Sequence, residues 1–153
     1  MNVVPGAPGR ALGVDLGSRR IGVAVSDDRR RVATALTVLA RTASPDEDHA
    51  RLANLVGETG ANVVVVGLPL SLSGDHGPAA RATEGELATL RRRLGVPVVA
   101  SDERYTTFIA RRVLASGGRR RALHREVVDH MAAAAILQTW LDRERALGAG
   151  PSQ

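Results

Sequence analysis

Two short apolar runs constrain the fold of this chain more than any other feature. They are NVVVVG at residues 62–67 and VPVVAS at residues 96–101. Runs without polar alternation are typical of strands that are buried on both faces, as in parallel sheets with helical crossovers. The two runs therefore predict an α/β protein with helices on both faces of its sheet.

The residue pattern around these runs predicts the remaining elements. Three strands in an antiparallel meander are expected at residues 11–17, 20–27 and 31–40. Helices are expected in four segments: from the Ser44 cap in SPDE to near Gly60, then 79–94, 106–116 and 126–147. The stretch GGRRRALHR at 117–125 is interpreted as a helix breaker.

The resulting order is β-β-β-α-β-α-β-α-α. It predicts a mixed five-stranded sheet, with three antiparallel strands followed by two parallel ones, flanked by helices. This is the element order of the ribonuclease H-like fold, and because a fold does not by itself give a function, the site has to be argued from its residues.

The composition is that of one globular domain. The chain has 153 residues, of which 44% are hydrophobic and only 2% aromatic, so aliphatic side chains must form the core. We expect a single domain at 11–146 between a flexible leader, 1–10, and a flexible tail, 147–153. Cysteine, a membrane-spanning apolar run and a signal-peptide pattern are all absent, so a cytoplasmic location without membrane contact is the expectation.

The charge balance favours a polyanionic partner. The formal net charge is +5, and all 21 basic residues are arginine. Arginine binds phosphate bidentately, which suits nucleic acid, although a genomic bias towards arginine codons also explains the missing lysine. A net charge of this size supports a nucleic-acid partner but does not establish one.

The first candidate carboxylate is Asp15, in the stretch ALGVDLGSRRIGVAVSD at residues 11–27. On an extended strand it shares a face with Gly13 and Gly17, so this face carries one carboxylate and almost no other side chain. Glycines in a strand indicate close approach of a backbone or a ligand, such as a metal-held phosphate. The alternative, that Asp15 caps the turn at Gly17–Ser18, stays open at this point.

Two further carboxylates follow from their positions on predicted elements. Glu103 comes just after the last strand, where binding crevices form in open α/β sheets; the alternative is a solvated acid in the next helical turn. Asp129 shares a helical stripe with Ala132, Ala133, Ile136 and Trp140, which would carry it towards the sheet. The alternative is that the helix begins at His130 and Asp129 is its N-cap.

Three carboxylates from separate elements predict a site for Mg²⁺ or Mn²⁺. Hard divalent cations prefer oxygen ligands, and a pair of them can catalyse phosphodiester cleavage. The four histidines show no zinc-ligand spacing; they are His49, His76, His124 and His130. His124 and His130, near Asp129, are interpreted as surface residues, with a role in proton transfer as the alternative.

Four stretches in this sequence resemble one known family. They are GVDLGSRRIGVAVSD (13–27), VVVGLPLSLSGDHGPAA (64–80), SDERYTT (101–107) and VDHMAAAAILQTWLD (128–142). In this order they resemble the YqgF, or RuvX, family of ribonuclease H-like nucleases, described as Holliday-junction resolvases and more often as pre-16S rRNA nucleases. The resemblance implies a two-metal-ion nuclease that processes the 5′ end of pre-16S rRNA in ribosome biogenesis, with Asp15, Glu103 and Asp129 as catalytic metal ligands.

The chain departs from the wider pattern of ribonuclease H-like nucleases at one position. Those nucleases place an acid at the end of the fourth strand, where this chain has Gly67-Leu68-Pro69. The resemblance implies that Glu103, on the neighbouring strand, takes over the role of that acid.

Candidate nucleic-acid contacts lie in glycine-rich or arginine-rich stretches. Backbone N–H groups near Gly74 and Gly77 can hold a phosphate. The arginine run 119–121 suits a nucleic-acid backbone, and a solvated linker is its alternative. The full set is Ser18, Arg19, Arg20, Gly74, Arg104, Thr106, Arg119, Arg120, Arg121 and Arg125. The scarcity of aromatic residues excludes recognition dominated by base stacking and favours a structured RNA or a DNA junction.

Three other functions compete with rRNA processing. The first is a Holliday-junction resolvase. The second is a non-catalytic RNA-binding module in ribosome assembly, which would gain nothing from converging acids. The third is an actin-like kinase or ATPase, suggested by DLGS at residues 15–18, but such proteins need a second domain for which 153 residues leave no room. Ribosomal proteins as partners, and a monomer or a homodimer, remain expectations.

Overall fold

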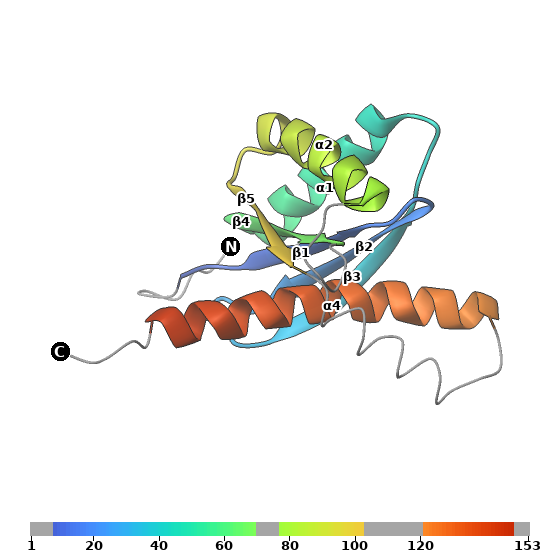
Figure 1. The fold of residues 1–153 in the computed structure, drawn as a ribbon. Helices are drawn as coiled ribbons and strands as arrows, with labels where there is room; N and C mark the ends of the chain where they lie inside the picture. The colour runs from blue at the N-terminus through green and yellow to red at the C-terminus, as the bar shows by residue number, and fades with distance from the viewer. Residues whose placement is uncertain (1–7, 70–76, 103–120, 149–153) are drawn as a thin grey trace.

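The computed structural model describes residues 8–69, 77–102 and 121–148, with only the backbone course described for residues 121–130. The strands are β1 (Ala11–Leu16), β2 (Arg20–Ser26), β3 (Ala33–Ala40), β4 (Val63–Leu68) and β5 (Val98–Asp102). The helices are α1 (Pro45–Thr59), α2 (Pro78–Arg93) and α4 (Arg121–Gly148). Figure 1 shows α1 and α2 on one side of the sheet and α4 on the other.

The five strands form one mixed sheet in the order β3-β2-β1-β4-β5. β2 is antiparallel to both β1 and β3, whereas β4 is parallel to both β1 and β5. The predicted sheet is thus confirmed, because a three-stranded meander is followed by two strands that each return through a crossover. β1 and β4 are the two strands with a parallel neighbour that also lie inside the sheet, and most residues of both are buried.

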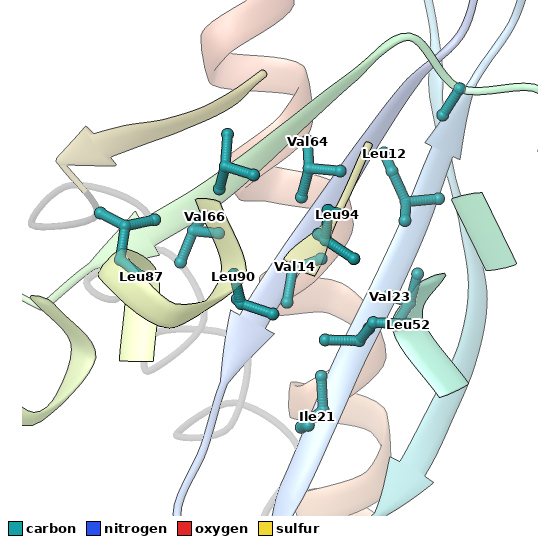
Figure 2. Packing of buried hydrophobic residues seen from close by; sticks show 12 residues of the cluster. Leu12, Val14, Ile21, Val23, Leu52, Val64, Val66, Leu87, Leu90 and Leu94 are labelled. Atoms are coloured by element: carbon teal, nitrogen blue, oxygen red, sulfur yellow. The ribbon is translucent and has the colours of Figure 1, made fainter. Parts of the chain in front are cut away.

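The sheet divides the core into two apolar layers. Figure 2 shows part of the layer under α1 and α2, and its fully enclosed members include Leu12, Val14, Ile21, Val23, Leu52, Val64, Val66 and Leu90. The second layer lies under α4 and consists of Ala11, Ala24, Val63, Val65, Ala133, Ile136, Leu137 and Leu141. Successive residues of β1 and β4 enter opposite layers, which confirms that both strands are buried on both faces.

The α1 helix begins and ends where the sequence predicts. The side chain of Ser44 accepts a hydrogen bond from the N–H of Glu47 at 3.2 Å, with Pro45 in the first helical position. At the other end, the N–H of Gly60 donates to the carbonyl of Val56. The capping residues predict the helix ends correctly because they satisfy the terminal N–H and C=O groups locally, without contacts from the rest of the fold.

The last helix corrects one prediction. α4 begins at Arg121 and includes residues 121–125, which the sequence analysis assigned to a helix breaker. Only the glycines of GGRRRALHR disfavour a helix, and the residues after them, Arg, Ala and Leu above all, are good helix formers. The helix predicted at 106–116 lies outside the described residues. Among the helices that are described, none is both long and apolar enough to span a bilayer.

Candidate functional site

The carboxyl ends of three strands meet at one edge of the sheet. Val14 of β1 pairs with Val66 of β4, and Val66 pairs with Ala100 of β5. One step further along the strands come Asp15 in β1 and Gly67 in β4, and Leu68 pairs with the last residue of β5. Crevices at such an edge are where open α/β sheets bind ligands, so we take this edge as the candidate site.

Asp15 lies at this edge on the face of the sheet that α4 covers. Two and four residues earlier, Gly13 and Ala11 contact the α4 layer, and side chains two apart on a strand point the same way. Asp15 is half-buried, and its partner across the β1–β2 ladder is Gly22. The neighbouring strand residue therefore contributes no side chain beside the carboxylate, which fits the predicted face with one carboxylate and almost no other side chain.

The turn after Asp15 is tight and depends on glycine. The N–H of Gly17 donates to the carbonyl of Asp15 at 3.1 Å, and a Cβ at Gly17 would lie 2.6 Å from the carbonyl oxygen of Arg20. Real Cβ atoms do not approach backbone oxygen so closely, so position 17 requires glycine. Ser18 and Arg19 are exposed at the tip of this turn, as a phosphate contact requires.

Gly13 explains why α4 can lie directly on β1. A Cβ at this position would be 2.6 Å from the Cβ of Leu137 and 3.0 Å from the carbonyl oxygen of Ala133. Glycines on this face predict close approach of a backbone or a ligand. At Gly13 the approaching group is the backbone of α4.

Asp129 lies in α4, eight residues after the helix begins, so the alternative in which it caps a helix starting at His130 is wrong. α4 runs antiparallel to β1: its later residue Gln138 bonds Ala33 at the opposite end of the sheet, and Figure 1 shows the same direction. Asp129 is one turn before Ala133, a rise of about 6 Å along the helix. Asp15 is about 7 Å beyond Gly13 along β1, so the two backbones reach the same level of the sheet.

Most of the other predicted site residues are outside the described part of the chain. Glu103 is the residue directly after β5, and its own position is not described. The same holds for five predicted nucleic-acid contacts, namely Gly74, Arg104, Thr106, Arg119 and Arg120, and for the side chains of Arg121 and Arg125. Arg20 is the first residue of β2 and is half-buried.

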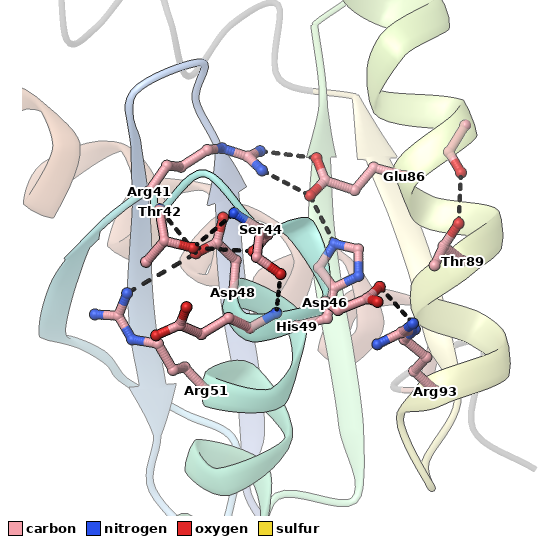
Figure 3. Close-up of polar contacts among 12 residues, drawn as sticks. Arg41, Thr42, Ser44, Asp46, Asp48, His49, Arg51, Glu86, Thr89 and Arg93 are labelled. Atoms are coloured by element: carbon pink, nitrogen blue, oxygen red, sulfur yellow. Dashed lines mark hydrogen bonds and ion pairs between the residues drawn. The ribbon is translucent and has the colours of Figure 1, made fainter.

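The structure shows a polar cluster beside the β1–β2 turn that was not predicted from the sequence. The guanidinium of Arg41 binds Glu86 through both terminal nitrogens, at 2.8 and 2.7 Å, and its Nε donates to the carbonyl of Gly17 at 2.7 Å. Nε2 of His49 lies 2.8 Å from the same carboxylate, and Figure 3 shows the three side chains meeting between α1 and α2. His49 is only 3% exposed, so its ring is part of the buried interior of this cluster.

No sequence signal marks this cluster, because its members come from three elements. Arg41 follows β3, His49 is in α1 and Glu86 is in α2. Each residue type is common on surfaces, and only the packing of α1 against α2 brings them together.

The cluster makes stability depend on pH through Glu86. Burial alone would raise the pKa of this carboxyl, but the hydrogen bonds and positive charge of Arg41, with the bond to His49, hold the pKa below its ordinary value of 4.5. A carboxyl with a lowered folded-state pKa contributes stability above that ordinary value and loses it as the pH falls through the folded-state pKa.

We expect Glu86→Gln to lower the free energy of unfolding at pH 7 by about 1.5–3 kcal/mol, because hydrogen bonds to charged groups are lost. Urea titrations of wild type and variant at pH 7 and pH 3 measure the difference. It should shrink at pH 3, where the wild-type carboxyl is increasingly protonated. A difference that is the same at both pH values would contradict the role of the Glu86 charge.

The sheet order, the two helical layers and the acid at the end of the central strand define a ribonuclease H-like α/β protein. Among solved structures, the chain is similar to Thermus thermophilus RuvC in complex with a Holliday junction substrate, with a TM-score of 0.55 and 17% identity. The match covers 90% of this chain and 96% of that one. At this identity the likeness establishes the shared fold.

The chain belongs to the RuvX family, whose model, described as "Holliday junction resolvase", matches residues 9–143. A relative from Mycobacterium sp. (strain KMS) is 44% identical over 95% of this chain and 86% of its own length. Another, from Chloroflexus aggregans, is 43% identical over 88% of this chain and 94% of its own length. Both relatives carry the name "Putative pre-16S rRNA nuclease". The family resemblance read from the four sequence stretches is therefore confirmed.

Proposed function

We propose that this protein is a divalent-metal-dependent nuclease that processes the 5′ end of pre-16S rRNA. The observation that carries the proposal is membership of the RuvX family over residues 9–143, with Asp15 at the carboxyl edge of the central strand. Relatives at 43–44% identity, matched over 86% and 94% of their own length, carry the name "Putative pre-16S rRNA nuclease". In the proposal, Asp15, Glu103 and Asp129 are the catalytic acids.

The residue types of this set fit magnesium or manganese. All three are carboxylates, the oxygen donors that hard divalent cations prefer, and the half-buried Asp15 has a glycine as its cross-strand neighbour. Bound divalent ions would supply an activated water and stabilise the negative charge that develops on the phosphate during hydrolysis. The chain itself supplies the rigid support: β1 holds Asp15, and α4, packed on β1 at Gly13, carries Asp129.

Binding of the substrate is proposed to be electrostatic and to follow its backbone. Ser18 and Arg19 are exposed on the turn directly after Asp15, within reach of a phosphate next to the one that is cut. The remaining predicted arginines, on either side of the start of α4, would extend the contact along the strand. Phosphate contacts fix the register of a nucleic acid without reading its bases, which suits recognition of a structured RNA by shape.

A second function is a Holliday-junction resolvase. The description of the family model favours it, and the RuvC structure of the same fold contains a Holliday junction substrate. A resolvase must cut two strands symmetrically, which requires two copies of the active site and hence a dimer. The two functions therefore predict different products and different oligomeric states on the substrate.

A cleavage panel tests the proposed function. Wild-type protein is incubated with a pre-16S rRNA leader mimic, an unstructured RNA and a four-way DNA junction, in Mg²⁺, in Mn²⁺ and in EDTA. We expect metal-dependent cutting of the leader, with binding that weakens as salt rises. Paired symmetric nicks in the junction alone would favour the resolvase. RNA binding without any cutting would favour a non-catalytic assembly module, and ATP hydrolysis without cutting would favour an ATPase.

A further inference from the structure

The β1–β2 turn, which follows the first catalytic acid of the proposed site, is bonded by one residue, Arg41. Nε of Arg41 donates to the carbonyl of Gly17, and the backbone N–H of Arg41 donates to the carbonyl of Arg19 at 2.9 Å. Arg41 thus bonds two of the carbonyls of the turn Gly17–Arg19. Since the N–H of Gly17 bonds the carbonyl of Asp15, the same turn is tied to the end of β1.

The guanidinium of Arg41 has its orientation fixed by Glu86. With Nε on Gly17 and both terminal nitrogens on one carboxylate, all three nitrogens of the fork have an acceptor. The side chains of Arg41 and Glu86 are 18% and 17% exposed, so the pair is largely shielded from water and from salt screening. A bidentate pair of this kind fixes direction as well as distance, which a lysine in place of Arg41 would not do.

His49 fixes Glu86 in turn. Nε2 of the imidazole bonds a carboxylate oxygen that also receives Arg41, while the buried Nδ1 has no hydrogen-bond partner among the described residues. A carboxylate only accepts hydrogen bonds, so Nε2 carries the proton of this bond. The ring therefore acts as a buried donor near the start of α1.

We propose that Arg41 is a positioning residue for cleavage: held by Glu86 and His49, it fixes the β1–β2 turn and thereby the Asp15 carboxylate at the end of β1. The inference rests on the proposed nuclease function of Asp15. In this proposal, residues on the α1–α2 side of the sheet contribute to a reaction at the α4 side. The connection is a series of hydrogen bonds. It leads from the imidazole to the carboxylate, from there to the guanidinium and the Gly17 carbonyl, and then to the end of β1.

Arg41→Lys is the test, because it keeps the positive charge but cannot bond Gly17 and both oxygens of Glu86 at once. We expect kcat for the cleaved substrate to fall about 10–100-fold, the usual effect of losing the support of a metal ligand. KM should change by less than about twofold, because the exposed Ser18 and Arg19 remain available to the substrate. The Mg²⁺ concentration for half-maximal rate should rise, because a less well fixed Asp15 binds the ion less tightly.

The matched control is Arg93→Lys. Arg93 of α2 forms an ion pair with Asp46 of α1 at 2.5 Å, and none of its described contacts is with the β1–β2 turn. It should leave kcat and the Mg²⁺ dependence unchanged. Assays are run well below the melting temperature of each variant, so that unfolding does not lower the rate.

A second readout is independent of activity. Hydrogen–deuterium exchange of the backbone at residues 17–20 should quicken in Arg41→Lys and not in Arg93→Lys, because local opening follows the loss of local bonds. If wild type cuts no substrate, the nuclease proposal fails, and exchange still shows whether Arg41 holds the turn. Wild-type exchange in Arg41→Lys would overturn the proposal, and so would faster exchange with an unchanged kcat.

His49 offers a conservative pair of variants. The amide nitrogen of Gln can reach the place of the imidazole Nε2, whereas the shorter side chain of Asn cannot. We expect His49→Gln to keep most of the wild-type kcat and turn protection, and His49→Asn to lose part of both. Equal loss of activity in the two variants would show that the Nε2 bond to Glu86 does not contribute to positioning.

Discussion

Asp15→Asn is expected to abolish metal-dependent cleavage while leaving the fold intact. An amide keeps the size of the carboxylate and loses the charge that a divalent cation requires. Removing an outer-shell partner of a metal ligand already costs about 10–100-fold, so loss of a ligand should cost more than about 100-fold in kcat. The measurement is the single-turnover rate on the substrate that the wild type cuts, with circular dichroism and urea unfolding to verify the fold.

Asp28→Asn is the matched control for this experiment. Asp28 is also half-buried, and it lies beyond β2 at the opposite end of the sheet, where its carboxylate pairs with Arg10 at 3.4 Å. The two variants change the net charge equally, so a general electrostatic effect on nucleic-acid binding would appear in both. Asp28→Asn should keep the wild-type rate. Metal-dependent cleavage retained by a clean preparation of Asp15→Asn would show that Asp15 is not part of the active site.

The second large effect is expected from Gly13→Ala. The added methyl would lie 2.6 Å from the Cβ of Leu137 and 3.0 Å from the carbonyl of Ala133, so α4 must move away from β1. Overpacking of a buried contact costs about 1–3 kcal/mol, and the cost should be at the upper end because neither clashing atom is a flexible side-chain end. Cleavage should fall as well, because the displaced helix carries Asp129.

Urea titration measures this loss, and Gly57→Ala is its control. Gly57 lies within α1, is exposed and has no atom within 4 Å of the Cβ that would be added. Alanine is a better helix former than glycine, so Gly57→Ala should stabilise the protein by about 0.5–1 kcal/mol. The same change at two glycines should therefore have opposite signs.

A double variant tests which atoms cause the clash. Leu137→Ala removes a fully buried side chain and should itself cost about 2–5 kcal/mol. It keeps the Cβ of residue 137 and the carbonyl of Ala133, which are the two atoms that the new methyl meets. Gly13→Ala combined with Leu137→Ala should therefore be less stable than either single variant. Recovery of stability in the double variant would contradict the contact between β1 and α4 described above.

Local sequence signals predicted most of the sheet and its covering helices. The cap at Ser44 and the apolar run at 63–66 gave the correct start of α1 and the correct strand β4. The predicted start of α4 was wrong. The glycines at 117–118 were taken to keep the next residues out of a helix, although those residues favour one. Such a boundary depends on propensities of a few tenths of a kcal/mol per residue, which tertiary contacts easily override.

The candidate site was predictable to a smaller extent. Asp15 stood out because a carboxylate between glycines is unusual in a strand, and the structure places it at the edge where parallel strands end. The glycine at 13 was expected to permit a close approach, but only the structure identifies α4 as the approaching element. Glu103 and the side chain of Asp129 lie outside the described residues, so their part in the site stays a prediction.

The sequence by itself determined the family, the order of elements and the acid of the central strand, because each is written in residues that are close together in the chain. Hydrophobic periodicity, capping and short motifs act over a few residues and can be read from one segment at a time. Only the tertiary structure decided that Arg41, His49 and Glu86 meet beside the β1–β2 turn. These residues are up to 45 positions apart, and the ion pair forms only once α1 and α2 have packed on the sheet.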